Sequence, residues 1–139
     1  MKKILFTLAI AVCTVTLFNS CSGAFSEDVP SNNVDAIVTK GEWKINQFIQ
    51  SNTDQSAQFA NYTFTFVDSR TVTANQNGTI VTGTWASDNY ANRIVLNFGN
   101  TPTLSKINQE WLINSQNEKA VTCINNDKPQ TEMLGLIQQ

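Results

Sequence analysis

Apolar and polar side chains alternate at every second position along much of this 139-residue chain. The pattern is clearest at Tyr62, Phe64 and Phe66, whose intervening neighbours are threonines. Successive side chains of an extended strand point to opposite faces, so a period of two predicts strands with one buried and one solvated face. The chain is therefore predicted to be all-β.

Turn signals divide the last hundred residues into eight predicted strands. Asn77-Gly78 is the strongest of these signals, because both residues tolerate positive φ in a tight hairpin. We expect a long loop over 50–60, where Thr53 or Asp54 could cap a short helix, a single helical turn over 104–108, and a turn over 114–117. The expected strands are 41–49, 62–66, 71–74, 79–86, 94–98, 111–113, 119–124 and 131–137.

The even spacing of these strands favours an antiparallel eight-stranded meander barrel. An open sheet of eight strands would expose two unpaired edges, and closure removes them. A two-sheet β-sandwich is the alternative, since a period of two is typical of both architectures. An eight-stranded barrel is either filled by side chains or holds one small ligand.

The first residues have the anatomy of a lipoprotein signal peptide. Lys2 and Lys3 are followed by a short apolar stretch over 4–18 and by Cys21, the expected site of lipid attachment. Residues 1–20 are therefore predicted to be removed. Lipid on Cys21 would anchor the chain in the cell envelope, at the outer membrane facing the periplasm or the cell surface.

The segment 21–40 is poor in large apolar residues, and we expect a flexible tether there. The domain itself is then 41–139. One core is expected for a domain of this length.

Composition excludes several kinds of chemistry. The chain contains no histidine, which excludes Ser-His-Asp and Cys-His catalysis and the usual zinc sites. Cys123 is the cysteine that remains once Cys13 leaves with the signal and Cys21 carries lipid, and it is expected in the core. We therefore predict a protein that is not an enzyme and that has no metal site and no cofactor.

Charged residues give no sign of a catalytic or nucleic-acid site. Removal of the signal leaves seven basic and eleven acidic residues, a net charge of −4, with no basic stripe for phosphates. Asp68, Asp88 and Asp127 fall in predicted turns, while Glu42 and Glu110 each precede a tryptophan and are expected to point outward. Asparagine-rich runs such as 75–77 are expected in solvated turns, with a sugar-binding surface as the functional alternative.

Two Gly-x-Trp triplets, Gly41-Glu42-Trp43 and Gly83-Thr84-Trp85, lie at predicted strands. The first resembles the lipocalin signature, and 41–139 as a whole resembles the lipocalin-like domains of bacterial lipoproteins of the Bacteroidota type. The resemblance implies a barrel whose floor is plugged by Trp43. No arginine follows Arg93, so the late arginine that stacks on the floor tryptophan in that family is missing.

The aromatic inner face and this resemblance lead to the hypothesis of a lipid-anchored barrel that binds a small apolar or amphipathic ligand. The alternative is a non-catalytic envelope domain that contacts a protein or a glycan through its loops. The alternative to a ligand-binding role is that these large side chains simply fill the hydrophobic core. The candidate cavity residues are Trp43, Tyr62, Phe64, Phe66, Trp85, Ile94, Leu96, Phe98 and Trp111.

Overall fold

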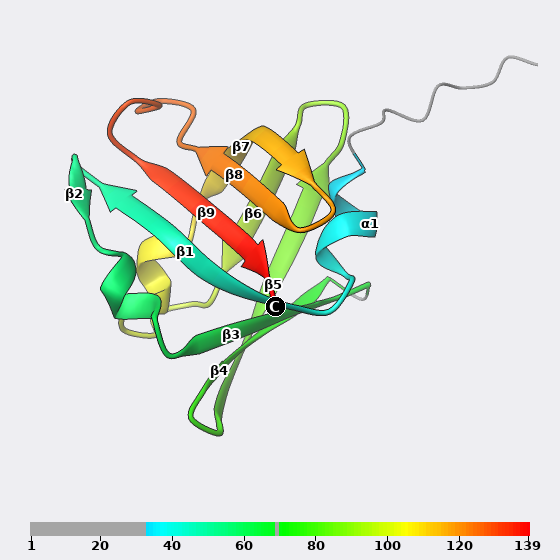
Figure 1. Cartoon of the computed structure of the whole chain (residues 1–139), viewed down its shortest axis with the longest axis vertical. Helices are drawn as coiled ribbons and strands as arrows, with labels where there is room; N and C mark the ends of the chain where they lie inside the picture. The colour runs from blue at the N-terminus through cyan, green and yellow to red at the C-terminus, as the bar shows by residue number, and fades with distance from the viewer. Residues whose placement is uncertain (1–32, 69) are drawn as a thin grey trace, which may run out of the picture.

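The alternating segments form one antiparallel sheet that closes into an eight-stranded barrel (Figure 1). The structure, a computed structural model, describes residues 33–68 and 70–139. Each strand of the barrel pairs with the next barrel strand along the chain, so the order is a meander. The strands of the barrel are β1 (Glu42–Gln50), β3 (Tyr62–Val67), β4 (Thr71–Gln76), β5 (Thr79–Asp88), β6 (Arg93–Asn97), β7 (Glu110–Asn117), β8 (Ala120–Ile124) and β9 (Met133–Gln138).

Pairing of the first strand with the last closes the barrel. β1 and β9 lie side by side in Figure 1, with a register that runs from Trp43–Gln138 to Ile49–Met133. On its other edge β1 pairs with β3 near its start and, near its end, with the two-residue strand β2 (Thr53–Asp54). The predicted barrel is confirmed, and the sandwich alternative is wrong because a single sheet pairs with itself.

The predicted alternation is confirmed in β3, β4 and β6, whereas β7 and β9 depart from it. In β3 the side chains of Tyr62, Phe64 and Phe66 are buried, and the threonines between them are partly exposed. The hairpin between β4 and β5 turns at Asn77 and Gly78, whose φ angles are +52° and +89°. Two successive positive φ angles match the right-handed twist of the flanking strands, so these residues fix the register of the hairpin.

Short helices occupy two of the connections. The predicted loop 50–60 contains β2 and the 3-10 helix η1 (Ser56–Phe59), where the Asp54 carboxylate accepts a hydrogen bond from the Ser56 backbone N–H at 2.8 Å. The helical turn predicted at 104–108 is confirmed as η2 (Leu104–Ile107). The predicted turn at 114–117 is wrong, because β7 continues to Asn117.

The tether predicted over 21–40 is wrong for its C-terminal part, which contains a helix. Residues Val34–Val38 form the helix α1, which begins at Asn33, where the side chain accepts a hydrogen bond from the Ala36 N–H. Val34 and Val38 lie one turn apart and are fully buried against the barrel. So short a helix is unstable alone and forms because the barrel covers its apolar face, which local composition does not reveal. The signal peptide and Cys21 lie outside the described residues.

No helix within residues 33–68 and 70–139 is long and apolar enough to span a bilayer.

Candidate functional site

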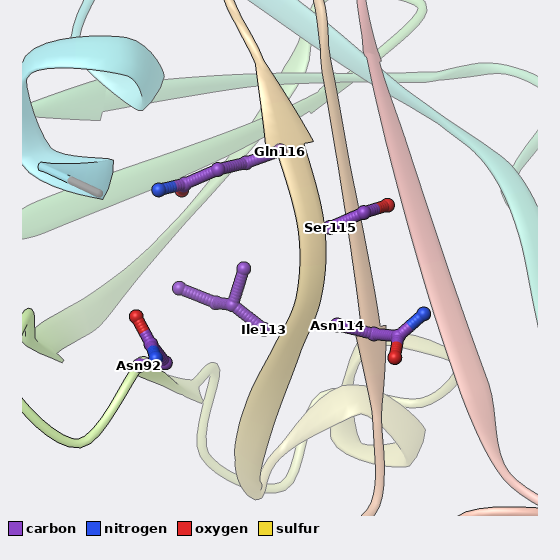
Figure 2. A pocket seen from close by; sticks show the side chains of 5 residues that line it. All are labelled: Asn92, Ile113, Asn114, Ser115 and Gln116. Atoms are coloured by element: carbon purple, nitrogen blue, oxygen red, sulfur yellow. The ribbon is translucent and has the colours of Figure 1, made fainter. Parts of the chain in front are cut away.

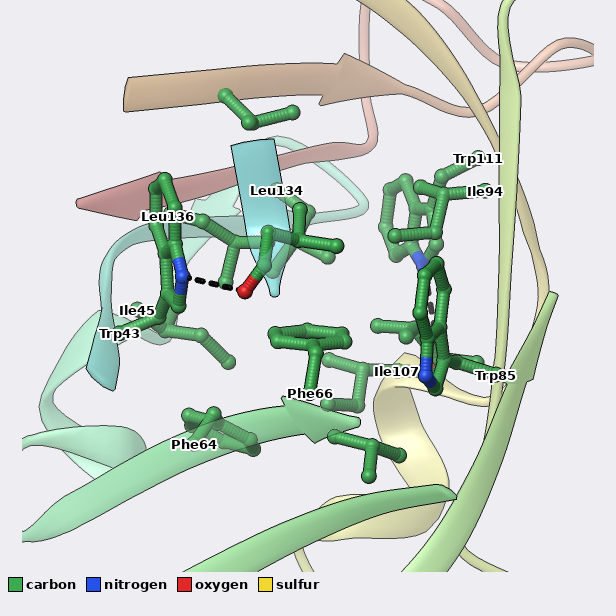
Figure 3. Close-up of a cluster of buried hydrophobic side chains, with 14 of the residues drawn as sticks. Trp43, Ile45, Phe64, Phe66, Trp85, Ile94, Ile107, Trp111, Leu134 and Leu136 are labelled. Carbon is green, nitrogen blue, oxygen red and sulfur yellow. Dashed lines mark hydrogen bonds between the residues drawn. The ribbon is translucent and has the colours of Figure 1, made fainter. Parts of the chain in front are cut away.

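All nine candidate cavity residues converge in the barrel interior, and none is more than 7% exposed. They belong to one hydrophobic cluster, part of which is drawn in Figure 3. The rings contact one another edge to face: the centroids of Phe66 and Trp85 are 5.5 Å apart, and those of Phe64 and Phe98 are 6.0 Å apart. These side chains are therefore packed together as a core, the arrangement that aromatic rings prefer.

Trp43 and Trp111 have no free polar atom for a ligand. The Trp43 indole N–H donates to the Val38 carbonyl at 2.8 Å, and the Trp111 indole N–H donates to the Ile107 carbonyl at 3.1 Å. Each tryptophan thus holds a short helix, α1 or η2, against the barrel. Figure 3 draws both side chains, with Trp43 and Trp85 on opposite sides of Phe66.

Trp85 is covered by an arginine that precedes it in the chain. The Arg70 guanidinium lies 4.8 Å from the Trp85 ring centroid and forms a 2.9 Å ion pair with Asp35 of α1. Ser87 bonds to both charged side chains, and the Trp85 indole N–H donates to the Val67 carbonyl at 3.0 Å. This cluster ties α1 to β5, and the arginine-tryptophan stacking involves Trp85 rather than Trp43.

Cys123 is fully buried, as predicted. Burial away from water raises the pKa of its thiol to about 12. The side chain is therefore a neutral thiol at physiological pH, which suits a core position rather than a nucleophile.

Several carboxylates of the described residues have structural partners. Glu42 and Glu110 are exposed, as predicted, and Glu110 pairs with Arg93 at 2.8 Å. Glu132 is the buried carboxylate, and it accepts bonds from Asn125 and Lys128 at 2.8 and 3.1 Å. Over the same residues, no group of three or more histidine, cysteine, aspartate or glutamate side chains could hold a metal ion.

A polar pocket of about 290 Å³ lies at the rim of the barrel, against β7 (Figure 2). Its lining contains three carboxamides, one hydroxyl and one aliphatic side chain, and no charged residue. Sequence reasoning missed it, because the polar run of β7 resembles a turn. The lining residues are Asn92, Ile113, Asn114, Ser115 and Gln116.

A bulge in β7 shapes this pocket. Ile113 pairs with Cys123 and Ser115 pairs with Thr122, so Asn114 is the extra residue. In a regular strand, residues three apart point to opposite faces; the bulge instead turns Ile113 and Gln116 to the same side, as Figure 2 shows. Asn92 lies across the pocket from Ile113, whereas the side chains of Asn114 and Ser115 point the other way.

Among solved structures, the chain is similar to a DUF4847 family protein from Bacteroides vulgatus ATCC 8482. The TM-score is 0.56 and the sequence identity 13%, over 76% of this chain and 97% of the other. A likeness at this identity supports a shared barrel fold. No protein-family model and no curated protein matches the sequence.

Proposed function

We propose that this protein is a lipid-anchored recognition domain of the cell envelope and that it binds its partner at the barrel rim. The packing of the interior carries this proposal. Large side chains contact one another inside the barrel, whereas the pocket of about 290 Å³ lies at the rim beside β7. Loops and strand ends on a rigid β scaffold commonly carry recognition.

The anchor is the part of the proposal that rests on Cys21. A charged start, an apolar stretch and a cysteine support lipid attachment there and a place at the outer membrane. Growth with an alkyne analogue of palmitate tests this directly. The full chain should incorporate the label and sediment with membranes, and Cys21→Ala should do neither. Equal labelling of both chains would refute the anchor.

We also propose that this protein is related to the lipocalins. Gly41 directly precedes β1, and Trp43, the second residue of β1, is buried and donates its indole N–H to the Val38 carbonyl of α1. A buried tryptophan at the start of the first strand supports the lipocalin resemblance.

The chemistry of the domain supports binding rather than catalysis. The chain lacks histidine, and the pKa of Cys123 is far above physiological pH. The net charge after signal removal is negative, which supports a partner other than nucleic acid.

A second candidate is binding of a small apolar or amphipathic ligand inside the barrel. The convergence of nine predicted lining residues in one cluster favours it. Such a ligand would have to displace contacts such as that between Phe66 and Trp85, since the interior side chains touch each other.

Nuclear magnetic resonance of the full chain separates the two candidates. The protein is titrated with two envelope fractions from its source bacterium, one of lipids and one of glycans. Indole N–H signals of Trp43, Trp85 and Trp111 report the interior, and side-chain amides of Asn92 and Gln116 report the rim. Changes at the rim amides support rim recognition, and changes confined to the indoles support the apolar ligand. Unchanged spectra with both fractions would refute both.

A further inference from the structure

The pocket at the rim lies beside a part of β7 that has lost its neighbour. The ladder between β6 and β7 consists of three pairs and ends at Arg93–Leu112. One further backbone bond, from the Ile113 N–H to the Asn92 carbonyl, measures 2.7 Å. Within the described residues, β7 from Ser115 to Asn117 pairs only with β8. The barrel wall therefore opens at the pocket.

Gln116 brings an unsatisfied amide to this opening. Its side-chain oxygen and nitrogen are both buried and have no hydrogen-bond partner among the described residues. Buried polar groups are nearly always paired, so an orphaned donor and acceptor on one side chain need an explanation. Because the amide makes no bond, rotating it toward a ligand in the pocket breaks none.

The turn that carries Asn92, on the other side of the pocket, is held by hydrogen bonds and also carries an exposed tyrosine. The Asp88 carboxylate accepts the backbone N–H groups of Tyr90 and Ala91 at 3.0 and 2.9 Å, and Asn89 accepts the Val34 N–H of α1 at 3.0 Å. These bonds fix the turn that carries Asn92. Tyr90 in the same turn is 86% exposed.

We propose that this pocket binds a neutral carbohydrate, with the Gln116 amide as a principal polar contact and Tyr90 as a platform beside it. The inference rests on the proposed rim recognition and names its ligand class. Carboxamides such as that of Gln116 both donate and accept hydrogen bonds, which matches sugar hydroxyls. The uncharged lining gives no counter-charge for an ionic ligand, and an aromatic ring offers its face to the apolar face of a sugar ring. The volume of about 290 Å³ suits a small saccharide, since it is just below the roughly 300–1,000 Å³ of pockets for drug-sized molecules.

The test uses the lipidated full chain in a detergent without a sugar headgroup. Glucose, N-acetylglucosamine, maltose and diacetylchitobiose are the neutral probes, and glucuronate is the matched anion. At least one neutral saccharide should shift the Gln116 side-chain amide and the Ser115 backbone N–H in a saturable way. Gln116→Met should weaken that binding about tenfold, the effect of losing one or two hydrogen bonds.

Two further variants control this result. Gln55→Met makes the same exchange outside the pocket and should leave the affinity unchanged. Tyr90→Ala changes a side chain that is too exposed to matter for folding and should weaken binding several-fold.

Each remaining outcome overturns the inference. If no neutral saccharide shifts the pocket signals while the envelope glycan fraction still shifts rim signals elsewhere, rim recognition stands and the carbohydrate pocket is refuted. If the glycan fraction also shifts no rim signal, both rim recognition and the carbohydrate pocket are refuted. If glucuronate binds as tightly as the neutral probes, the assignment of a neutral ligand is refuted. If the signal shifts caused by a saccharide persist in both Gln116→Met and Tyr90→Ala, the pocket is not the binding site.

Discussion

Replacing Gln116 by methionine should make the barrel more stable. The amide oxygen and nitrogen of Gln116 are covered and unpaired, so the folded chain has lost their hydration without gaining a hydrogen bond. An unsatisfied buried donor or acceptor costs about 1–3 kcal/mol. Methionine has a similar length and flexibility and carries neither group.

The expected gain is about 2 kcal/mol in the free energy of unfolding, measured by urea denaturation. For a domain of this size that corresponds to a rise of roughly 8 °C in melting temperature. Gln55→Met is the matched control. The Gln55 side chain bonds to Gln50, Gln58 and Lys106 at 3.2, 2.8 and 3.0 Å, so the same exchange should cost about 1 kcal/mol.

The decisive result is a higher free energy of unfolding for Gln116→Met together with a lower one for Gln55→Met. If Gln116→Met destabilises the protein as Gln55→Met does, the Gln116 amide has partners in solution and the reasoning fails. A gain in stability together with a loss of saccharide affinity would show a binding group kept at the expense of stability, the trade-off common at functional sites.

Three other substitutions or measurements test the core. Trp43→Phe removes the indole donor from the buried Val38 carbonyl and should lower the free energy of unfolding in urea by about 1–3 kcal/mol; unchanged hydrogen exchange in α1 would contradict this contact. Gly83→Ala would place a Cβ 2.5 Å from the Asn97 carbonyl oxygen, so thermal unfolding should show a loss of about 1–3 kcal/mol, and full stability would contradict that close approach. The native Cys123 thiol should resist iodoacetamide at pH 8 and react once the protein is unfolded. Because its folded pKa of about 12 exceeds the ordinary value of 9.0, its contribution to stability should be complete below pH 9 and decline between about pH 9 and 12, a decline that Cys123→Val should reduce.

The strands were predictable because burial repeats along them. Tyr62, Phe64 and Phe66 lie inside the barrel as their spacing indicates, and the Asn77-Gly78 hairpin follows from the φ angles that these residues tolerate. Barrel closure follows from the lack of protected sheet edges, and the β1–β9 ladder confirms it.

Helix α1 and the rim pocket depend on tertiary contacts that a local pattern does not contain. Val34 and Val38 offer only two apolar positions, and the helix exists because the barrel covers them. The pocket depends on the bulge at Asn114, whose polar neighbours suggested a turn. A bulge is set by the register of two strands, so neither strand alone encodes it visibly.

The ladder between β1 and β9 also governs when the protein can fold. Strand β1 can close the barrel only once the residues of β9, Met133–Gln138, are present, and these are about ninety positions further along the chain. Until they arrive, β1 and β8 each present an unpaired edge to other chains, and such edges promote aggregation. Chains truncated before Met133 should therefore be prone to aggregate.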